Sequence, residues 1–133
     1  MLNAVRPLPL ILLLVGPLGC SGVNASKFEP IFKTADDIET STPETFTEQR
    51  SLFNRALSTL EEQRLSSSER GVVRLLEQAA QEWLLADIAF DEYRQATDQR
   101  QRDAGLAHAT EGLERGSRYV EKAKQLVSGG RLF

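Results

Sequence analysis

The sequence predicts an all-α protein, an antiparallel bundle of three to four helices that follows a cleaved signal peptide and a short tether. Ala, Leu, Glu, Gln and Arg dominate the chain after Pro43, and these residue types favour helices. Apolar residues recur at three- and four-residue intervals, which places them on single helix faces. With 41% hydrophobic and 26% charged residues, the 133-residue chain suits one folded domain.

Residues 1–19 are predicted to be a signal peptide. Arg6 is followed by an apolar run from Leu8 to Val15 and then by small and turn-forming residues. The apolar stretch covers roughly 11 residues, whereas a helix that spans a bilayer needs about 20. We therefore expect the leader to be removed and the mature protein to contain no transmembrane helix.

The only cysteine of the chain, Cys20, stands at the end of this apolar run. The segment PLGCSG around it resembles the lipobox of bacterial lipoproteins, with small Gly19 before the cysteine and with Pro17 where the family usually has Leu. The resemblance implies that Cys20 becomes the first mature residue and carries acyl chains. Ser21 stands where an Asp would signal retention in the inner membrane, so the implied location is the outer membrane, facing the periplasm. Residues 20–27 would then be the lipidated cysteine and a flexible tether, and residues 28–129 the helical domain.

A second cleavage site is also compatible with the sequence. Val23 and Ala25 are small residues at the two positions that an ordinary signal peptidase reads, so cleavage after Ala25 would release a soluble periplasmic protein.

The first two helices are predicted on both sides of Pro43. A helix from Phe28 to Glu39 accommodates Pro30 only in its first turn, and the sequence TSTP ends it. The next helix should have Thr42 as its N-cap and Pro43 at its first position, and should end near Arg64. If the first helix is loosely held, its aromatic edge becomes an exposed binding patch; that edge consists of Phe28, Phe32 and Phe46.

The last two helices are the longer ones. Serines 66–68 offer a capping box with Glu69 for a helix over residues 68–97, whose wide apolar arc makes it central and makes Trp83 a core anchor. The polar stretch 98–103 predicts a turn, after which Asp98 or Asp103 caps a helix that runs to Val127. Every second position of that helix's stripe is small, which favours tight packing; the stripe consists of Leu106, Ala109, Leu113, Gly116, Val120, Ala123 and Val127.

Two alternatives remain open for this architecture. The repeated 3.5-residue spacing fits an intramolecular bundle and equally an intermolecular coiled coil, because a stripe does not reveal whose helix covers it. The segments AFDEYRQA and DAGLAHATEGLERG also faintly resemble a tetratricopeptide helix pair, although the spacing from Trp83 and the missing proline depart from that pattern.

Composition and charge argue against several functions. The net charge is −3, and removal of Arg6 with the leader leaves 15 of 16 basic side chains against 19 acidic ones, or −4. Basic and acidic residues alternate along every helix, so no basic face for nucleic acid is expected. A lone cysteine excludes an internal disulfide or a thiolate metal cage. No phosphate-binding loop, nucleophile elbow or Cys–His arrangement is present, so we expect neither an enzyme nor a bound cofactor.

Two weak candidate sites can be named from side-chain spacing. His108 and Glu111 lie one helical turn apart and could contribute to a metal site, although bundle metal sites need further inward carboxylates. Asp87 and Asp91 share a helix face and could form a ligand-binding carboxylate pair if a cleft desolvated them.

The sequence as a whole favours a lipid-anchored envelope protein that acts as a helical scaffold or protein-interaction module. Its expected partners are the membrane, through the anchor on Cys20, and an envelope protein, with no nucleic acid. The alternative is a periplasmic helical bundle that binds a small ligand or a metal.

Overall fold

The computed structural model describes residues 22–129, and every regular element in that range is a helix. A short 3₁₀ helix, η2 (Ala25–Phe28), leads directly into α2 (Glu29–Glu39). The chain continues through α3 (Phe46–Glu61), α4 (Ser67–Gln95) and α5 (Gln99–Val127). The predicted signal peptide and Cys20 lie outside the described residues.

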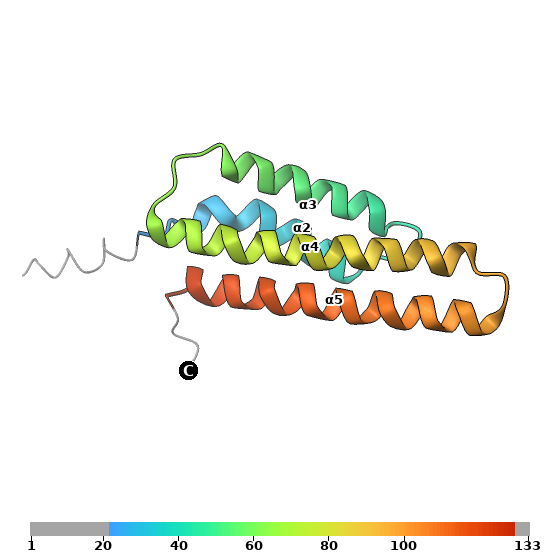
Figure 1. Ribbon diagram of the computed structural model, residues 1–133. Coiled ribbons are helices and arrows are strands. Elements are labelled where there is room, and N and C mark those ends of the chain that lie inside the picture. The colour runs from blue at the N-terminus through green and yellow to red at the C-terminus, as the bar shows by residue number, and fades with distance from the viewer. Residues whose placement is uncertain (1–21, 130–133) are drawn as a thin grey trace, which may run out of the picture.

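The four α-helices form the predicted antiparallel bundle. Each helix packs against two others, in the order α2, α3, α4, α5 and back to α2. The 29-residue helices α4 and α5 form a long hairpin, and the shorter α2 and α3 lie along one part of it (Figure 1). Residues 22 and 129 lie at the same end of the bundle, which we call the base, and the α4–α5 turn at residues 96–98 forms the opposite end, the tip.

Large side chains from α3 fill the core against α4. Phe53 meets Trp83 edge to face with 4.9 Å between the ring centroids, and Phe46 packs on Phe90 at 5.1 Å. Trp83 is fully buried, as the sequence predicts. The aromatic edge, expected to be exposed if the first helix were loose, is instead mostly covered, because α2 packs on both α3 and α5; Phe28 and Phe46 are fully buried and Phe32 is partly buried.

Helices α4 and α5 are in close contact along a line of mostly small residues on α5, which we call the seam. An added Cβ atom on Gly116 would lie 2.2 Å from Nε1 of Trp83, and one on Gly105 would lie 2.9 Å from the backbone nitrogen of Tyr93. At Gly105 the two backbones therefore approach more closely than a residue with a Cβ atom allows, and at Gly116 the ring of Trp83 occupies the place of a side chain. The predicted tight packing is thus confirmed, although Leu106 of the predicted stripe is 41% exposed. The buried seam residues of α5 are Gly105, Ala109, Gly112, Gly116, Val120 and Ala123.

Two helix starts differ from the prediction. The second helix begins at Phe46 and not at Pro43, because the backbone N–H of Thr45 bonds to the carbonyl of Thr42 at 3.0 Å and closes a turn before the helix. The polar stretch 98–103 is not a turn: Asp98 caps the N–H of Gln101 at 2.8 Å, so that residues 99–103 already belong to α5. The predicted capping box of Ser66 and Glu69 is confirmed at the start of α4.

The expected flexible tether is a further correction. From Gly22 onward the chain lies on the bundle, since Val23 packs against the core and residues 25–28 form η2. Gly22 has a positive φ of 65°, a conformation that glycine adopts without steric cost. The segment is held in place by a set of polar contacts to the start of α4.

Candidate functional site

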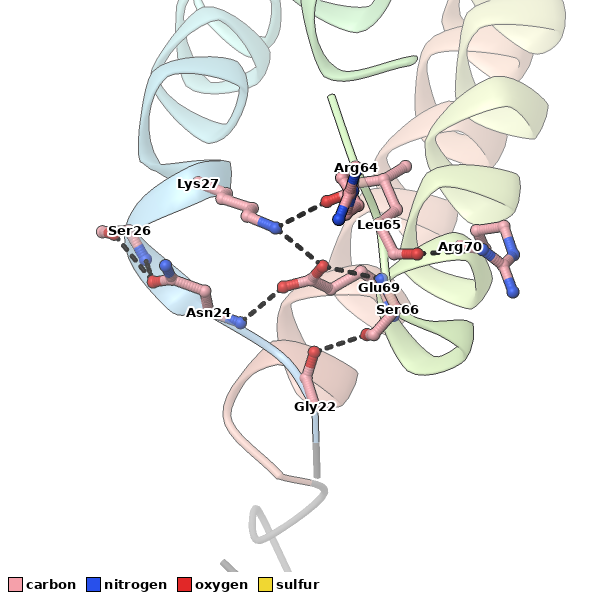
Figure 2. A network of polar contacts seen from close by, with 9 residues as sticks. All are labelled: Gly22, Asn24, Ser26, Lys27, Arg64, Leu65, Ser66, Glu69 and Arg70. Carbon is pink, nitrogen blue, oxygen red and sulfur yellow. Dashed lines mark hydrogen bonds and ion pairs between the residues drawn. The ribbon is translucent and has the colours of Figure 1, made fainter. Parts of the chain in front are cut away.

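The base of the bundle carries a polar network that joins the N-terminal segment to α4, which we call the base clasp (Gly22, Asn24, Lys27, Ser66 and Glu69). Figure 2 shows Glu69 at its centre. Its carboxylate accepts hydrogen bonds from Nζ of Lys27 at 2.9 Å, from the N–H of Ser66 at 3.0 Å and from the N–H of Asn24 at 2.8 Å. The hydroxyl of Ser66 donates to the carbonyl oxygen of Gly22.

The electrostatics of the clasp favour an ionised Glu69. The side chain is only 4% exposed, and burial alone would raise its pKa. The hydrogen bond from Lys27, those from the backbone N–H groups of Ser66 and Asn24, and the charge of Lys27 outweigh burial and lower the pKa to about 2. Lys27 also donates to the carbonyl oxygen of Arg64 at 3.0 Å, so one cation ties η2 to the α3–α4 connection and to the first turn of α4.

Sequence reasoning missed this clasp as a contact between distant segments. It identified Glu69 only as a partner of the serine cap and assigned Lys27 to the tether. The capping box hydrogen bonds are local and follow from spacing, whereas the bonds from Asn24 and Lys27 cross more than 40 residues. No pattern within either segment indicates such a pairing.

The predicted carboxylate pair does not form a common site. Asp87 is buried and accepts hydrogen bonds from Oγ1 of Thr47 at 2.7 Å and Nε of Arg50 at 2.9 Å, both on α3. Asp91 is exposed and pairs with Arg94. Asp87 therefore joins α4 to α3, and the structure gives the two carboxylates separate cationic partners.

His108 and Glu111 are both exposed on α5. Within residues 22–129, no group of three or more metal-ligating side chains is close enough to hold an ion. His108 does line an open hollow of about 370 Å³ at the tip, together with Glu92 and Gly105. The structure thus brings no further ligand to the predicted pair.

An exposed apolar patch lies on α4 instead. Leu84, Leu85 and Ile88 are 45%, 54% and 50% exposed, although they lie in the middle of a helix whose other faces pack on α3 and α5. Leu84 and Ile88 belong to the wide apolar arc from which a central helix, contacted on more than one side, was predicted. No helix of the described bundle covers this patch.

Comparisons with protein families, with curated proteins and with solved structures gave no match to this chain. The tetratricopeptide likeness finds no support in the helix lengths, because α4 and α5 have 29 residues each and a tetratricopeptide repeat places both helices in about 34. Among residues 22–129, no helix combines the length and the apolar character that a membrane span requires.

Proposed function

We propose that this chain is a lipid-anchored protein of the bacterial envelope that acts as a helical scaffold or protein-interaction module. The observation that carries the proposal is the position of the single Cys20 at the end of the apolar leader. An acyl anchor at this residue would attach the bundle to the outer membrane, with the domain in the periplasm.

The base clasp supports cleavage before Cys20 over cleavage after Ala25. Cleavage after Ala25 would remove Gly22, Val23 and Asn24. With them the fold would lose the hydrogen bond from Ser66, the core contact of Val23 and the hydrogen bond from Asn24 to Glu69. A mature chain that keeps these contacts must begin at Gly22 or earlier.

The clasp also bears on orientation. Two peptide units separate Cys20 from Gly22, and they reach at most about 7 Å. A lipid on Cys20 would therefore hold the base against the membrane, and α4, with its 29 residues, would carry the tip about 40 Å away. The patch of Leu84, Leu85 and Ile88 would lie on the side of this upright bundle, where another envelope protein can reach it.

Metabolic labelling with a fatty-acid analogue tests the anchor. We expect the wild-type chain to incorporate label and Cys20→Ala to incorporate none. The control is Ala25→Leu, which blocks the alternative cleavage site at an exposed position and should leave labelling unchanged. A native chain that begins at Ser26 and carries no acyl mass would overturn the proposal.

A further inference from the structure

A small hollow on α5 is lined by side chains that donate hydrogen bonds, and we call it the cationic hollow. It has a volume of about 180 Å³ and is lined by Arg115, Arg118, Tyr119 and Lys122. The last three follow Arg115 by three, four and seven positions, so all four share one face of the helix. No carboxylate of residues 22–129 lines this hollow, whereas Glu92 lines the one at the tip.

The three cations of the hollow are held in different ways. Nε of Arg115 donates to the carboxylate of Glu82 on α4 at 2.7 Å, which fixes this guanidinium group beside the hollow. Nζ of Lys122 lies 5.6 Å from the centre of the Tyr119 ring, in a cation–π contact. Arg118 is exposed and takes part in no ion pair within residues 22–129. Two of the three cations are therefore available to an anion.

The acidic residues of α5 near the hollow do not neutralise it. Three glutamates lie within one helical turn of its cations, and in the described part of the chain none forms an ion pair with them; these are Glu111, Glu114 and Glu121. Glu121 pairs instead with Lys124 at 3.9 Å. Because only Glu82 balances a charge of the hollow, Arg118 and Lys122 leave it with two positive charges.

We propose that the cationic hollow binds a phosphate group. A guanidinium group presents its N–H donors in a fork that matches phosphate oxygens, and an ammonium group adds a compact positive charge. A phosphate monoester carries a charge of about −1.5 to −2 at neutral pH, which matches the two positive charges of the hollow. Sites for drug-sized ligands begin at roughly 300 Å³, so the smaller hollow suits the phosphate group alone and not a whole nucleotide.

A free phosphate ester and the headgroup of a phospholipid both present this chemistry. Lys122 lies about 8 Å along the helix axis from Val127, where α5 ends at the base. The headgroup layer of a bilayer is about 5 to 7 Å thick. An anchor on Cys20 would therefore bring the lower end of the hollow close to the lipid phosphates. Only the lipid source depends on the proposed function, because a free phosphate ester can reach the hollow without an anchor.

Titration of the unacylated Cys20→Ser chain with inorganic phosphate tests the site. The amide NMR signals of residues 115–122 should shift with a millimolar dissociation constant, and sodium chloride at the same ionic strength should not reproduce the shifts. Arg118→Gln should raise the dissociation constant roughly fivefold, because one charge-assisted pair is lost. Arg55→Gln removes the same charge from an exposed position on α3 and should leave the dissociation constant unchanged.

Vesicle binding by the same variants distinguishes the two sources. A lipid site should retain the Cys20→Ser chain on phosphatidylcholine vesicles that contain phosphatidic acid, and Arg118→Gln should abolish this retention while Arg55→Gln keeps it. Phosphate binding without retention identifies a free phosphate ester. Binding in neither experiment, or equal effects of Arg118→Gln and Arg55→Gln, would overturn the proposal. Neither experiment uses the acyl anchor, so a failure of fatty-acid labelling would overturn the anchor and leave the phosphate site standing.

Discussion

The seam between α4 and α5 and the layer formed by α2 and α3 are packed by opposite means. At the seam, glycines and alanines bring two backbones together, and an added Cβ atom on Gly116 would overlap Trp83. In the α2–α3 layer, α3 reaches α4 through large rings such as Phe46 and Phe53 and through the ion pair of Arg50 with Asp87. The base clasp at Glu69 ties the segment that leads into α2 to the start of α4. The seam should therefore be damaged by added atoms, and the layer by removed atoms or removed charges.

Trp83 lies where the two kinds of packing meet, so its truncation should have the largest effect. The ring is fully buried, packs on Phe53 and donates a hydrogen bond from Nε1 to the carbonyl oxygen of Leu113 at 3.3 Å. Trp83→Ala should lower the free energy of unfolding by about 4 kcal/mol, because it leaves a cavity between α3, α4 and α5. Urea unfolding of the unacylated Cys20→Ser chain measures this. A loss below about 1 kcal/mol would mean that the layer and the seam do not depend on a shared side chain.

The base clasp makes the stability of the layer depend on pH. The folded pKa of Glu69, about 2, lies below its ordinary value of 4.5. Its stabilisation is therefore fully present above pH 4.5 and is lost as pH falls from 4.5 towards 2, by at most about 3 kcal/mol.

Unfolding curves between pH 7 and pH 2 check this dependence. Glu69→Gln should lower stability at pH 7 and flatten the profile below pH 4.5. Glu62→Gln, at an exposed position, is the matched control and should leave the profile as it is in the wild type. If the free energy of unfolding of Glu69→Gln varied with pH as it does in the wild type, the clasp would not be a source of stability.

Two glycines sharpen the contrast between the seam and an open surface. Gly116→Ala should destabilise the protein by about 2 kcal/mol, because the new methyl group cannot be placed without moving Trp83. An added Cβ atom on Gly71 in α4 would have no other atom within 4 Å. Gly71→Ala should therefore stabilise the protein by about 0.5 to 1 kcal/mol, because alanine has the higher helix propensity. Thermal unfolding of both variants measures the difference. Equal effects at the two positions would contradict the close packing of the Trp83 ring on Gly116.

The fold was largely predictable because its determinants are local. The 3.6-residue apolar period and the capping box of Ser66 both involve residues that are close together in the sequence. They place α4 within two residues of its observed bounds. The predicted start of α3 was wrong. The sequence TSTPET is compatible with proline at a first helical position and equally with the turn from Thr42 to Thr45 that the structure contains. Which of them forms depends on contacts from outside, such as Arg94, which donates to the carbonyl oxygen of Pro43 at 2.8 Å.

The candidate sites were less predictable, because they depend on which helix faces which. Spacing correctly placed Asp87 and Asp91 one turn apart, but only the packing of α3 buries the first and leaves the second exposed. The ordered segment from Gly22 to Lys27 was taken for a tether because its residues are small and polar. Its partner, Glu69, is 42 residues away from Lys27. The lipidation of Cys20 lies outside the described residues and stays a prediction.

The two carboxylates also give the smallest test of the comparison. Asp87→Asn should destabilise the protein by about 1.5 kcal/mol, because Arg50 loses a charged acceptor in a half-buried position between α3 and α4. Asp91→Asn, one turn away, should change stability by less than about 0.5 kcal/mol, since its pair with Arg94 is exposed. Equal losses measured by urea unfolding would mean that the Asp87–Arg50 pair contributes no more to stability than the exposed Asp91–Arg94 pair. A larger loss at Asp91 would place the important polar contact at the Arg94 end of α4, next to the turn that precedes α3.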